Sequence, residues 1–414
     1  MIVLHAYKTE LNLNNVQNTA CTRHAGAARW AYNWGLGRKM EAYRNGEKVP
    51  SAIDLHRELN VLKQGELSWM YEISKCAPQE ALRNLDQAYA HFFRRVKEKK
   101  AGRKIQAGFP KFKAKKHGLG SFRLTGAIHI YDHAIQLPRL GRLRLKERGY
   151  LSVEGVHILS ATVSERAGRW FVSVQVERNI PDPKTTYKPV VGVDLGILTL
   201  ATFSDGTRID NPRALKSSLC KIKRLQRTVS RRKKGSANRE KAVRQLARAH
   251  LRVANVRKDT LHQVTSRLAT LAPAASAGGT KSAVVLEDLN VSGMVQNHRL
   301  AQAIADVGFY EFRRQMMYKG QWYGCKIILA PRFYPSTKCC SRCGHTKLEM
   351  GLGERVYICE HCGLMIDRDL NAAINLEQLT TGSSPVSYAC GENVSPGYQA
   401  VLVEAGTEQQ STNA

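Results

Sequence analysis

The chain has 414 residues, of which 43% are hydrophobic and 24% charged, a composition typical of globular proteins with two or three domains. Lys and Arg number 64 against 34 Asp and Glu, so the net charge is +30 and an anionic partner is expected. The sequence has no apolar run of membrane-spanning length and no signal-peptide pattern, which favours nucleic acid over membrane as the partner and predicts a cytoplasmic, nucleoid-associated protein.

The N-terminal part predicts a strand followed by a helical module. Residues 1–13 have the pattern of a strand entering a loop, and from Asn18 to about Arg95 the sequence is rich in Ala, Leu, Arg and aromatic residues with helical spacing. The corresponding domain bounds are 1–15 and 16–109. At Gly108–Lys116 glycine and proline break the helix, and basic residues alternate with aromatic ones. This pattern suits phosphate contact with base stacking, although a solvated basic loop has the same pattern. The candidate nucleic-acid contacts here are Lys111, Lys113, Lys115 and Lys116.

Several short strands are predicted between residues 110 and 180. The hydrophobic period there is two, as in Val172, Val174 and Val176, which marks one face of a strand. Short strands at this density indicate a small β-barrel or sandwich, and the N-terminal strand is placed to complete it. Residues 181–189 are interpreted as a linker because they begin with Pro181-Asp182-Pro183-Lys184.

Residues 190–380 predict an α/β domain in the order strand, hairpin, long basic helices, strand, helix, strand, cysteine module and helix. Within it, residues 221–258 hold fifteen Lys or Arg against one acid, Glu240. A solvated helix face normally mixes the two signs, so this helical hairpin is a candidate phosphate-binding surface. The contacts assigned to it are Arg231, Arg232, Lys233 and Lys234.

Acidic residues stand at the ends of three apolar elements in this domain. Asp194 and Glu287 each end an apolar strand, and Asp367 and Asp369 begin an apolar-periodic helix. A single acid in such a place is explained by a turn or a helix N-cap. Two strand-end carboxylates and one at a helix start can instead meet at one sheet edge and hold two Mg²⁺ ions about 4 Å apart. The three acids are therefore candidates for a two-metal centre, with turn or N-cap roles as the alternative.

The most specific motif is Cys340-Ser341-Arg342-Cys343, followed after fifteen residues by Cys359-Glu360-His361-Cys362. Two such knuckles predict a closed tetrahedral zinc site with a structural role, within a ribbon at residues 335–364. Cys339 can replace Cys340 only with a less usual spacing. Five of the ten cysteines lie between residues 339 and 362, a distribution that does not suit a disulfide framework.

The C-terminal segment differs in composition from the rest of the chain. Residues 381–414 contain no Lys or Arg and are rich in Gly, Ser, Thr and Gln, which predicts a disordered tail.

The motifs, taken in order, resemble those of TnpB, the transposon-encoded RNA-guided nuclease family related to type V CRISPR effectors. The residues that carry this resemblance are Gly192–Gly196, Leu286–Leu289, Cys340–Cys362 and Asp369–Ala373, with His24–Gly26, Ala81–Asp86, Gly108–Lys113 and Arg332–Lys338. The likeness extends from near the N-terminus to about Leu379, so only the tail lies outside it.

The resemblance implies an α/β multidomain fold. Its parts are a wedge-type oligonucleotide-binding barrel (1–15 and 110–180), a helical recognition insertion (16–109) and a RuvC-like, ribonuclease-H-like nuclease domain (190–380) with an inserted Cys₄ zinc ribbon. It also implies that Asp194, Glu287 and Asp369 are the catalytic, Mg²⁺-binding carboxylates. Asp369 is preferred because it stands before x-Asn-Ala-Ala, and Asp367 is the alternative.

The partners implied by the resemblance are a guide RNA from the end of the transposable element and target double-stranded DNA with a short adjacent motif. A monomer is expected. Three other functions share some of these features: a guide-directed repressor that binds DNA without cutting, a transposase that performs strand transfer, and a plain zinc-ribbon DNA-binding protein. The presence of all three acids favours cleavage over repression.

Overall fold

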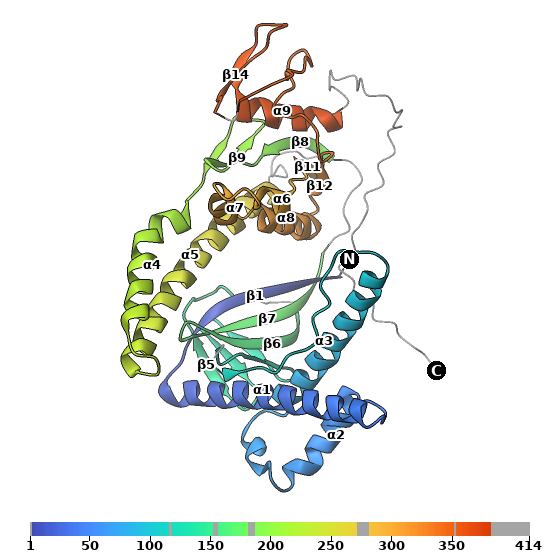
Figure 1. The fold of residues 1–414 in the computed structure, drawn as a ribbon, viewed down its shortest axis with the longest axis vertical. Helices are drawn as coiled ribbons and strands as arrows, with labels where there is room; N and C mark the ends of the chain where they lie inside the picture. The colour runs from blue at the N-terminus through green and yellow to red at the C-terminus, as the bar shows by residue number, and fades with distance from the viewer. Residues whose placement is uncertain are drawn as a thin grey trace.

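The computed structural model describes residues 2–115, 118–151, 156–180, 187–270, 281–351 and 353–381. Lys116, most of the predicted linker and the predicted tail beyond Thr381 lie outside these ranges. Two larger sheets with their helices organise the chain, and a two-stranded sheet lies at one end of the molecule (Figure 1). This arrangement confirms the predicted α/β class.

The first sheet has seven strands in the order β2-β6-β7-β1-β5-β4-β3, all of them paired antiparallel. The strands are β1 (Ile2–Asn12), β2 (Ser121–Leu124), β3 (His129–Tyr131), β4 (Ala134–Leu137), β5 (Gly141–Leu145), β6 (His157–Arg166) and β7 (Arg169–Asn179). β1 lies at the centre of the order, because it pairs with β7 along most of its length and with β5 at its end. The N-terminal strand therefore joins the later strands, as the sequence predicts.

Helices fill the chain between β1 and β2. They are α1 (Asn15–Arg44), α2 (Ala52–Lys63), the 3₁₀ helix η1 (Ser68–Glu72) and α3 (Cys76–Lys100). A Cβ added at Gly35 of α1 would lie 2.7 Å from Leu82 of α3, so the two helices pack closely there. The helical pattern predicted to end near Arg95 continues to Lys100. Gly102 adopts φ +84° just after α3, and residues 103–114 form neither helix nor strand.

The second sheet has five strands in the order β10-β9-β8-β11-β12. They are β8 (Tyr187–Asp194), β9 (Thr199–Phe203), β10 (Arg208–Asp210), β11 (Lys281–Leu286) and β12 (Lys326–Leu329). β8, β9 and β10 are antiparallel, whereas β8, β11 and β12 are parallel. β8 begins earlier than the predicted domain boundary at residue 190, because Tyr187 already pairs with Lys281 of β11.

Helices cover both faces of the second sheet (Figure 1). The elements are α4 (Ala214–Arg231), α5 (Ala237–Thr270), α6 (Val291–Met294), α7 (Ala301–Val307), α8 (Phe309–Tyr323) and α9 (Arg368–Thr381). Val284 of β11 shares a buried cluster with α5 and α8, whereas Val285 packs with Leu376 of α9. Neighbouring strand residues face opposite sides, so α5 and α8 cover one face and α9 covers the other. The predicted element order is confirmed.

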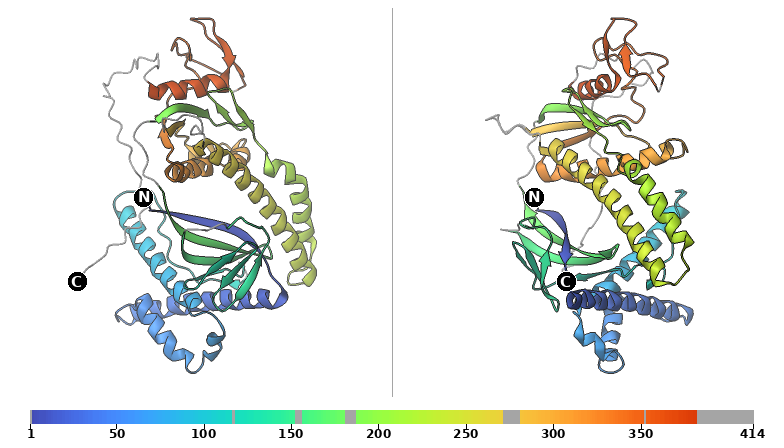
Figure 2. Two further views of the ribbon diagram at one scale, coloured as in Figure 1. Left: turned by 180° about the vertical axis from the view of Figure 1, so that it is seen from behind. Right: turned by 90° about the vertical axis from the view of Figure 1, so that its left-hand side faces the viewer.

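Contacts between the first sheet and the helices that cover the second sheet include a ring stack and a hydrogen bond. The His5 ring of β1 stacks on Trp322 of α8 with ring centroids 3.7 Å apart. The Nε–H of Arg248 in α5 donates to the carbonyl oxygen of Ala167, between β6 and β7, at 3.4 Å. Figure 2 shows α4 and α5 extending together from the second sheet to the side of the first.

Candidate functional site

Asp194 and Glu287 lie at equivalent positions on two adjacent parallel strands. Val193 of β8 is paired with Leu286 of β11, and each acid is the next residue along its strand. Val193 and Leu286 are buried in the cluster with α5 and α8, so the residues that follow them face the opposite side, toward α9. Because adjacent strands are about 4.8 Å apart, the two carboxylates are close neighbours.

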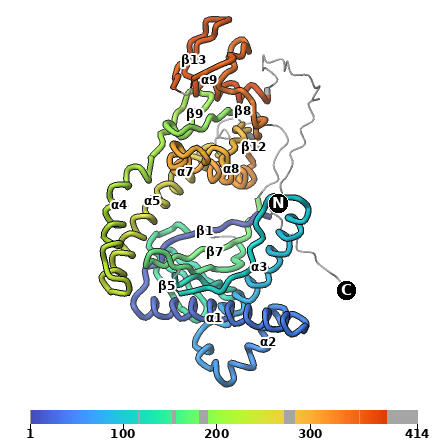
Figure 3. The backbone as a smooth tube through the Cα atoms, viewed as in Figure 1, coloured from blue at the N-terminus to red at the C-terminus, as the bar shows by residue number. Residues whose placement is uncertain are grey.

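Helix α9 brings Asp369 to the same edge of the sheet. β8 and α9 are far apart in the sequence but lie side by side (Figure 3). A Cβ added at Gly192 would lie 1.9 Å from the carbonyl oxygen of Ala373, so this approach requires glycine. Asp369 precedes Ala373 by about one helical turn and lies on the same side of α9. The helix therefore places this acid near the end of β8.

Burial and mutual repulsion dominate the electrostatics of this cluster. Asp194 is 8% exposed, and its burial together with the charges of Glu287 and Asp369 raises its pKa well above the usual range. Burial likewise raises the pKa of Glu287, although a hydrogen bond from Ser336 opposes that shift. Buried carboxylates that repel one another are stabilised by a divalent cation, and oxygen donors suit Mg²⁺. The donor set therefore fits the predicted metal.

The cysteines and the carboxylates differ in how closely their ligand atoms lie together. Within the described ranges, the set of metal-binding side chains whose ligand atoms all lie within 4.8 Å of one another is a cysteine set, not an acidic one. The three carboxylates do not form such a set.

Asp367 and Asp369 have different surroundings. Asp367 acts as the N-cap of α9, because its Oδ1 accepts hydrogen bonds from the backbone N–H groups of Asp369 and Leu370 at 3.1 and 3.0 Å. Its Oδ2 also lies 3.0 Å from Arg208. Asp369 is paired with the neighbouring Arg368 at 3.2 Å and contributes to the raised pKa of Asp194. Asp369 is thus the member of the doublet that interacts with Asp194.

Ser336 and Asn375, which sequence reasoning did not identify, hold this cluster together. The Ser336 hydroxyl donates to Glu287, and the Ser336 carbonyl oxygen accepts from the Asn375 side chain at 2.7 Å. Asn375 also donates to the carbonyl oxygen of Cys339 at 2.8 Å. Asn375 is 1% exposed, and such a buried amide requires partners. An asparagine at an apolar-periodic position was the sequence signal that could have identified it.

The four predicted zinc ligands converge. The Sγ atoms of Cys340, Cys343, Cys359 and Cys362 all lie within 4.8 Å of one another. Four thiolates at this spacing fit a tetrahedral zinc ion. The Cys339 thiol contacts the carbonyl oxygens of Cys340 and Gly344 instead, at 3.7 and 3.6 Å.

Both cysteine knuckles have the same backbone turn. Gly344 follows Cys343 and Gly363 follows Cys362, with φ of 75° and 69°, values that favour glycine. The second knuckle leads into a hairpin of β13 (Val356–Ile358) and β14 (Met365–Asp367), after which α9 begins.

Asn371 links the first knuckle to α9. Its side chain accepts a hydrogen bond from the backbone N–H of Ser341 at 3.0 Å and donates to the Cys339 carbonyl oxygen at 2.6 Å. The cysteine cluster is therefore attached to the helix that carries Asp369.

The predicted basic contacts differ in their surroundings. Arg231, Arg232, Lys233 and Lys234 are exposed where α4 ends, and Lys111 and Lys115 are exposed before β2. Lys113 is exposed as well, and its ammonium lies 3.8 Å from the centroid of the Tyr32 ring. Asn33 of α1 exchanges two hydrogen bonds with the Lys113 backbone, at 2.9 and 2.8 Å. Lys113 therefore anchors the loop to α1, a contact that its spacing in the sequence did not reveal.

A basic cavity of about 620 Å³ lies along the α4–α5 pair. Among the described residues, its lining contains five cationic side chains and no acidic one: Arg169, Lys221, Arg224, Arg248 and Arg252. Arg169 comes from the start of β7, so both sheets' modules contribute to it. Fixed positive charge in a concave site concentrates polyanions.

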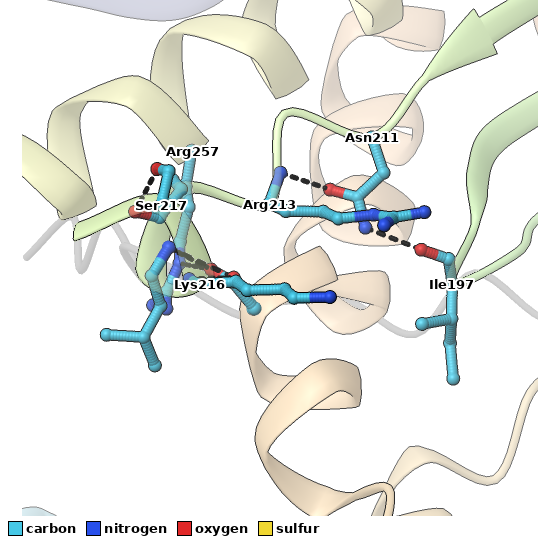
Figure 4. Close-up of polar contacts among 9 residues, drawn as sticks. Ile197, Asn211, Arg213, Lys216, Ser217 and Arg257 are labelled. Atoms are coloured by element: carbon cyan, nitrogen blue, oxygen red, sulfur yellow. Dashed lines mark hydrogen bonds and ion pairs between the residues drawn. The ribbon is translucent and has the colours of Figure 1, made fainter. Parts of the chain in front are cut away.

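Lys216 of α4 and Arg257 of α5 lie close together at the start of α4 (Figure 4). Asp306 of α7 holds the two helices there. Its carboxylate accepts hydrogen bonds from the backbone N–H groups of Leu215 and Lys216 in the first turn of α4, at 3.0 and 3.3 Å. It also accepts from the Nε–H of Arg257 in α5 at 2.6 Å. One buried carboxylate thus caps α4 and ties it to α5.

None of the described helices is both long and apolar enough to cross a membrane.

Three segments of the chain match known protein families. Residues 171–298 match the OrfB_IS605 family, described as "Probable transposase". Residues 309–376 match the "Cas12f1-like, TNB domain", and residues 1–48 match a "Helix-turn-helix domain". In this chain the last of these segments forms β1 and the single helix α1.

Relatives of nearly the full length support the same grouping. A "Putative RNA-guided DNA endonuclease" of Streptomyces pristinaespiralis is 34% identical, over 95% of this chain and 92% of its own. The "Putative RNA-guided DNA endonuclease InsQ" of Escherichia coli K12 is 32% identical, over 95% of this chain and 96% of its own. The chain belongs to the TnpB family of OrfB-type proteins.

Proposed function

We propose that this protein is an RNA-guided DNA endonuclease of a transposable element, which cuts target DNA next to a short adjacent motif. The observation that carries the proposal is the register of β8 and β11, which sets Asp194 beside Glu287, with Asp369 of α9 on the same face. Relatives that are named as RNA-guided DNA endonucleases and match over nearly their full length support it.

Asp194, Glu287 and Asp369 are the residues proposed to hold two Mg²⁺ ions. When bound, such ions supply Lewis-acid activation of the attacking water and of the scissile phosphate. The protein's own contribution is to hold the carboxylates in place. The Ser336 hydroxyl hydrogen bonds to Glu287 and favours its ionised form, and Gly192 positions Asp369 by letting α9 lie against β8. The cysteine cluster is proposed to bind structural zinc.

The domain assignments follow from this function. Residues 190–380 are proposed as the RuvC-like, ribonuclease-H-like nuclease domain, which the mixed sheet with acids at the ends of its central strands supports. The seven-stranded sheet is proposed as the wedge barrel and α1–α3 as the recognition insertion.

Guide RNA and target DNA are proposed to bind along the basic surface of α4 and α5. This surface contains two sets of cations. One is the exposed tip at Arg231–Lys234, and the other lines the cavity and includes Arg169, Arg224 and Arg248. Each neutralised duplex phosphate contributes a slope of roughly −0.9 to log K against log salt, so binding should weaken steeply with salt.

The test uses the full chain expressed together with the DNA that flanks its gene. RNA that copurifies is sequenced, its guide segment is matched to a plasmid target with a randomised flank, and linear product is measured in Mg²⁺ and in EDTA. Asp194→Ala should abolish cutting and retain target binding, whereas Asp205→Ala, an exposed acid in the β9–β10 turn, should cut normally. Full cutting by Asp194→Ala would refute the assignment of that carboxylate.

Strand transfer is the second candidate function, favoured by the description of the matched OrfB_IS605 family. Three-acid metal centres also perform that reaction. The same purified complex, incubated with transposon-end DNA and a plasmid, separates the two: joined molecules support transfer, and cut ends alone support the endonuclease.

A further inference from the structure

Phe333 is the most exposed aromatic side chain among the residues that the structure describes, at 89%. A single exposed apolar side chain needs no explanation in itself. Its position is what matters here, because Phe333 lies in the segment that connects β12 to the first cysteine knuckle.

The chain on both sides of Phe333 is fastened to the carboxylate cluster. The backbone N–H of Ala330 donates to the carbonyl oxygen of Leu286, the residue before Glu287, at 2.8 Å. Ser336 donates to Glu287 itself. Three residues of chain span at most about 11 Å, so Phe333 lies within that distance of Ser336.

The turn that carries Phe333 has a defined shape. The backbone N–H of Tyr334 donates to the Pro331 carbonyl oxygen at 2.9 Å, which closes a β-turn with Phe333 in its centre. The Arg332 guanidinium donates two hydrogen bonds to Asp288, at 3.0 and 2.8 Å. The Tyr334 hydroxyl donates to the Asn375 carbonyl oxygen of α9 at 3.3 Å. The ring is thus presented to solvent by a fixed backbone.

The charges around this turn suit a polyanionic strand. Asp288 is already paired with Arg332 and with Arg313 of α8, so its negative charge is balanced by two guanidinium groups. Both arginine side chains keep substantial exposure, 52% and 40%, and remain able to approach a phosphate. An exposed aromatic ring beside accessible cations is the combination that binds single-stranded nucleic acid.

We propose that Phe333 is a stacking platform for an unpaired nucleobase of the strand being cut, and that it fixes that strand relative to Asp194, Glu287 and Asp369. This inference rests on the proposed endonuclease function and adds a base-binding site to it. The ligand is an unpaired base because a base inside a duplex already has its faces stacked on its neighbours. Any base fits, since each has a π-face, so the site contributes positioning without reading sequence.

The experiment compares three variants in the purified protein–RNA complex. Phe333→Ala removes the ring, Phe333→Tyr keeps a stacking ring, and Leu348→Ala truncates an apolar side chain of the zinc ribbon that is 92% exposed. Single-turnover cutting should fall by about tenfold in Phe333→Ala and stay within about twofold of wild type in the other two. Thermal unfolding should be the same in all of them, because both positions are exposed.

A second measurement detects the contact without cutting. In the Asp194→Ala background, 5-iodouracil is placed at successive positions of each target strand, irradiated, and the crosslinked residue is identified by mass spectrometry. Residue 333 should crosslink at one or two adjacent positions when it is Phe or Tyr, and not when it is Ala. Absence of any crosslink to residue 333, or cutting by Phe333→Ala at the wild-type rate, would overturn the proposal. A wild-type complex that binds target and does not cut would defeat the endonuclease function, while the crosslink would still decide the stacking contact.

Discussion

Gly192 and Ala373 lie in backbone contact, because a Cβ added at Gly192 would be 1.9 Å from the Ala373 carbonyl oxygen and 2.6 Å from the backbone nitrogen of Glu377. Neither atom belongs to a flexible side chain, so α9 itself has to shift if a methyl group is added. This relationship connects the packing of the sheet directly to the position of Asp369.

Gly192→Ala should therefore reduce the cutting rate strongly and lower the free energy of unfolding only moderately. Overpacking of a tight contact costs about 1–3 kcal/mol, which lowers the melting temperature by a few degrees. Displacement of a catalytic group by about 1 Å can reduce the rate by 10²-fold. Gly26→Ala in α1 is the matched control, because no atom lies within 4 Å of the added Cβ and alanine favours the helix. Equal cutting by Gly192→Ala and wild type would contradict the proposed role of α9.

Ser336→Ala should move the acidic limb of the pH–rate profile to higher pH. Burial raises the pKa of Glu287 and the Ser336 hydroxyl lowers it, so loss of the hydroxyl leaves the pKa higher still. Cutting requires the ionised carboxylate, so activity is lost as pH falls through this pKa, and the loss should begin at higher pH in the variant. At pH values well above the acidic limb, the cutting rates of Ser336→Ala and wild type should converge. A higher Mg²⁺ concentration should shift the acidic limb of both proteins to lower pH, because the cation competes with protons. A uniform rate decrease at every pH would indicate a structural effect instead.

Zinc removal should disable cutting through α9. Ser341 of the first knuckle is bonded to Asn371 of that helix, and Cys339 just before the knuckle is bonded to Asn371 and Asn375. Disorder in the ribbon should therefore reach Asp369. Cys362→Ser should lower bound zinc from about one ion per chain, lower the melting temperature and reduce cutting by more than tenfold. Cys220→Ser, at an exposed thiol of α4, and Cys339→Ala should both retain zinc. Metal content is measured by atomic absorption, and loss of zinc from Cys339→Ala would show that Cys339 is a ligand.

The elements and the chemistry-bearing residues were predictable because their signals are local. An apolar strand that ends in Asp194 or Glu287, and two knuckles that each end in Cys-Gly, are visible within a few residues. The pairing of β8 with β11, which makes the two acids neighbours, follows from the parallel sheet that the element order implies.

The supporting contacts were not predictable because they join residues that only the fold brings together. Ser336 contacts Glu287 and Asn375 contacts Ser336 across about 40 to 50 residues of chain. Lys113 is part of a basic run, and only the position of Tyr32 on α1 explains why its ammonium lies over that ring. The start of β8 at Tyr187, before the predicted boundary at residue 190, has the same cause, because pairing with Lys281 of β11 extends the strand.

Asp306→Ala should loosen the contact between the first turn of α4 and the helix α5. Asp306 is 6% exposed and bonds two backbone N–H groups of α4 and the Arg257 side chain of α5, so its removal leaves three donors without their acceptor. Breaking a mostly buried charged contact of this kind costs about 3 kcal/mol, which a denaturant titration resolves.

The consequence for nucleic acid follows from geometry, because α4 and α5 must stay together for Lys221 and Arg224 of one helix and Arg248 of the other to face the same cavity. RNA affinity should therefore fall in Asp306→Ala by about tenfold, with a shallower salt slope, since fewer phosphates are neutralised together. Asp259→Ala, at an exposed position of α5, removes the same charge without touching this contact between α4 and α5, and it should leave stability and salt slope unchanged. If the two variants bind RNA equally, the cavity is not part of the binding surface.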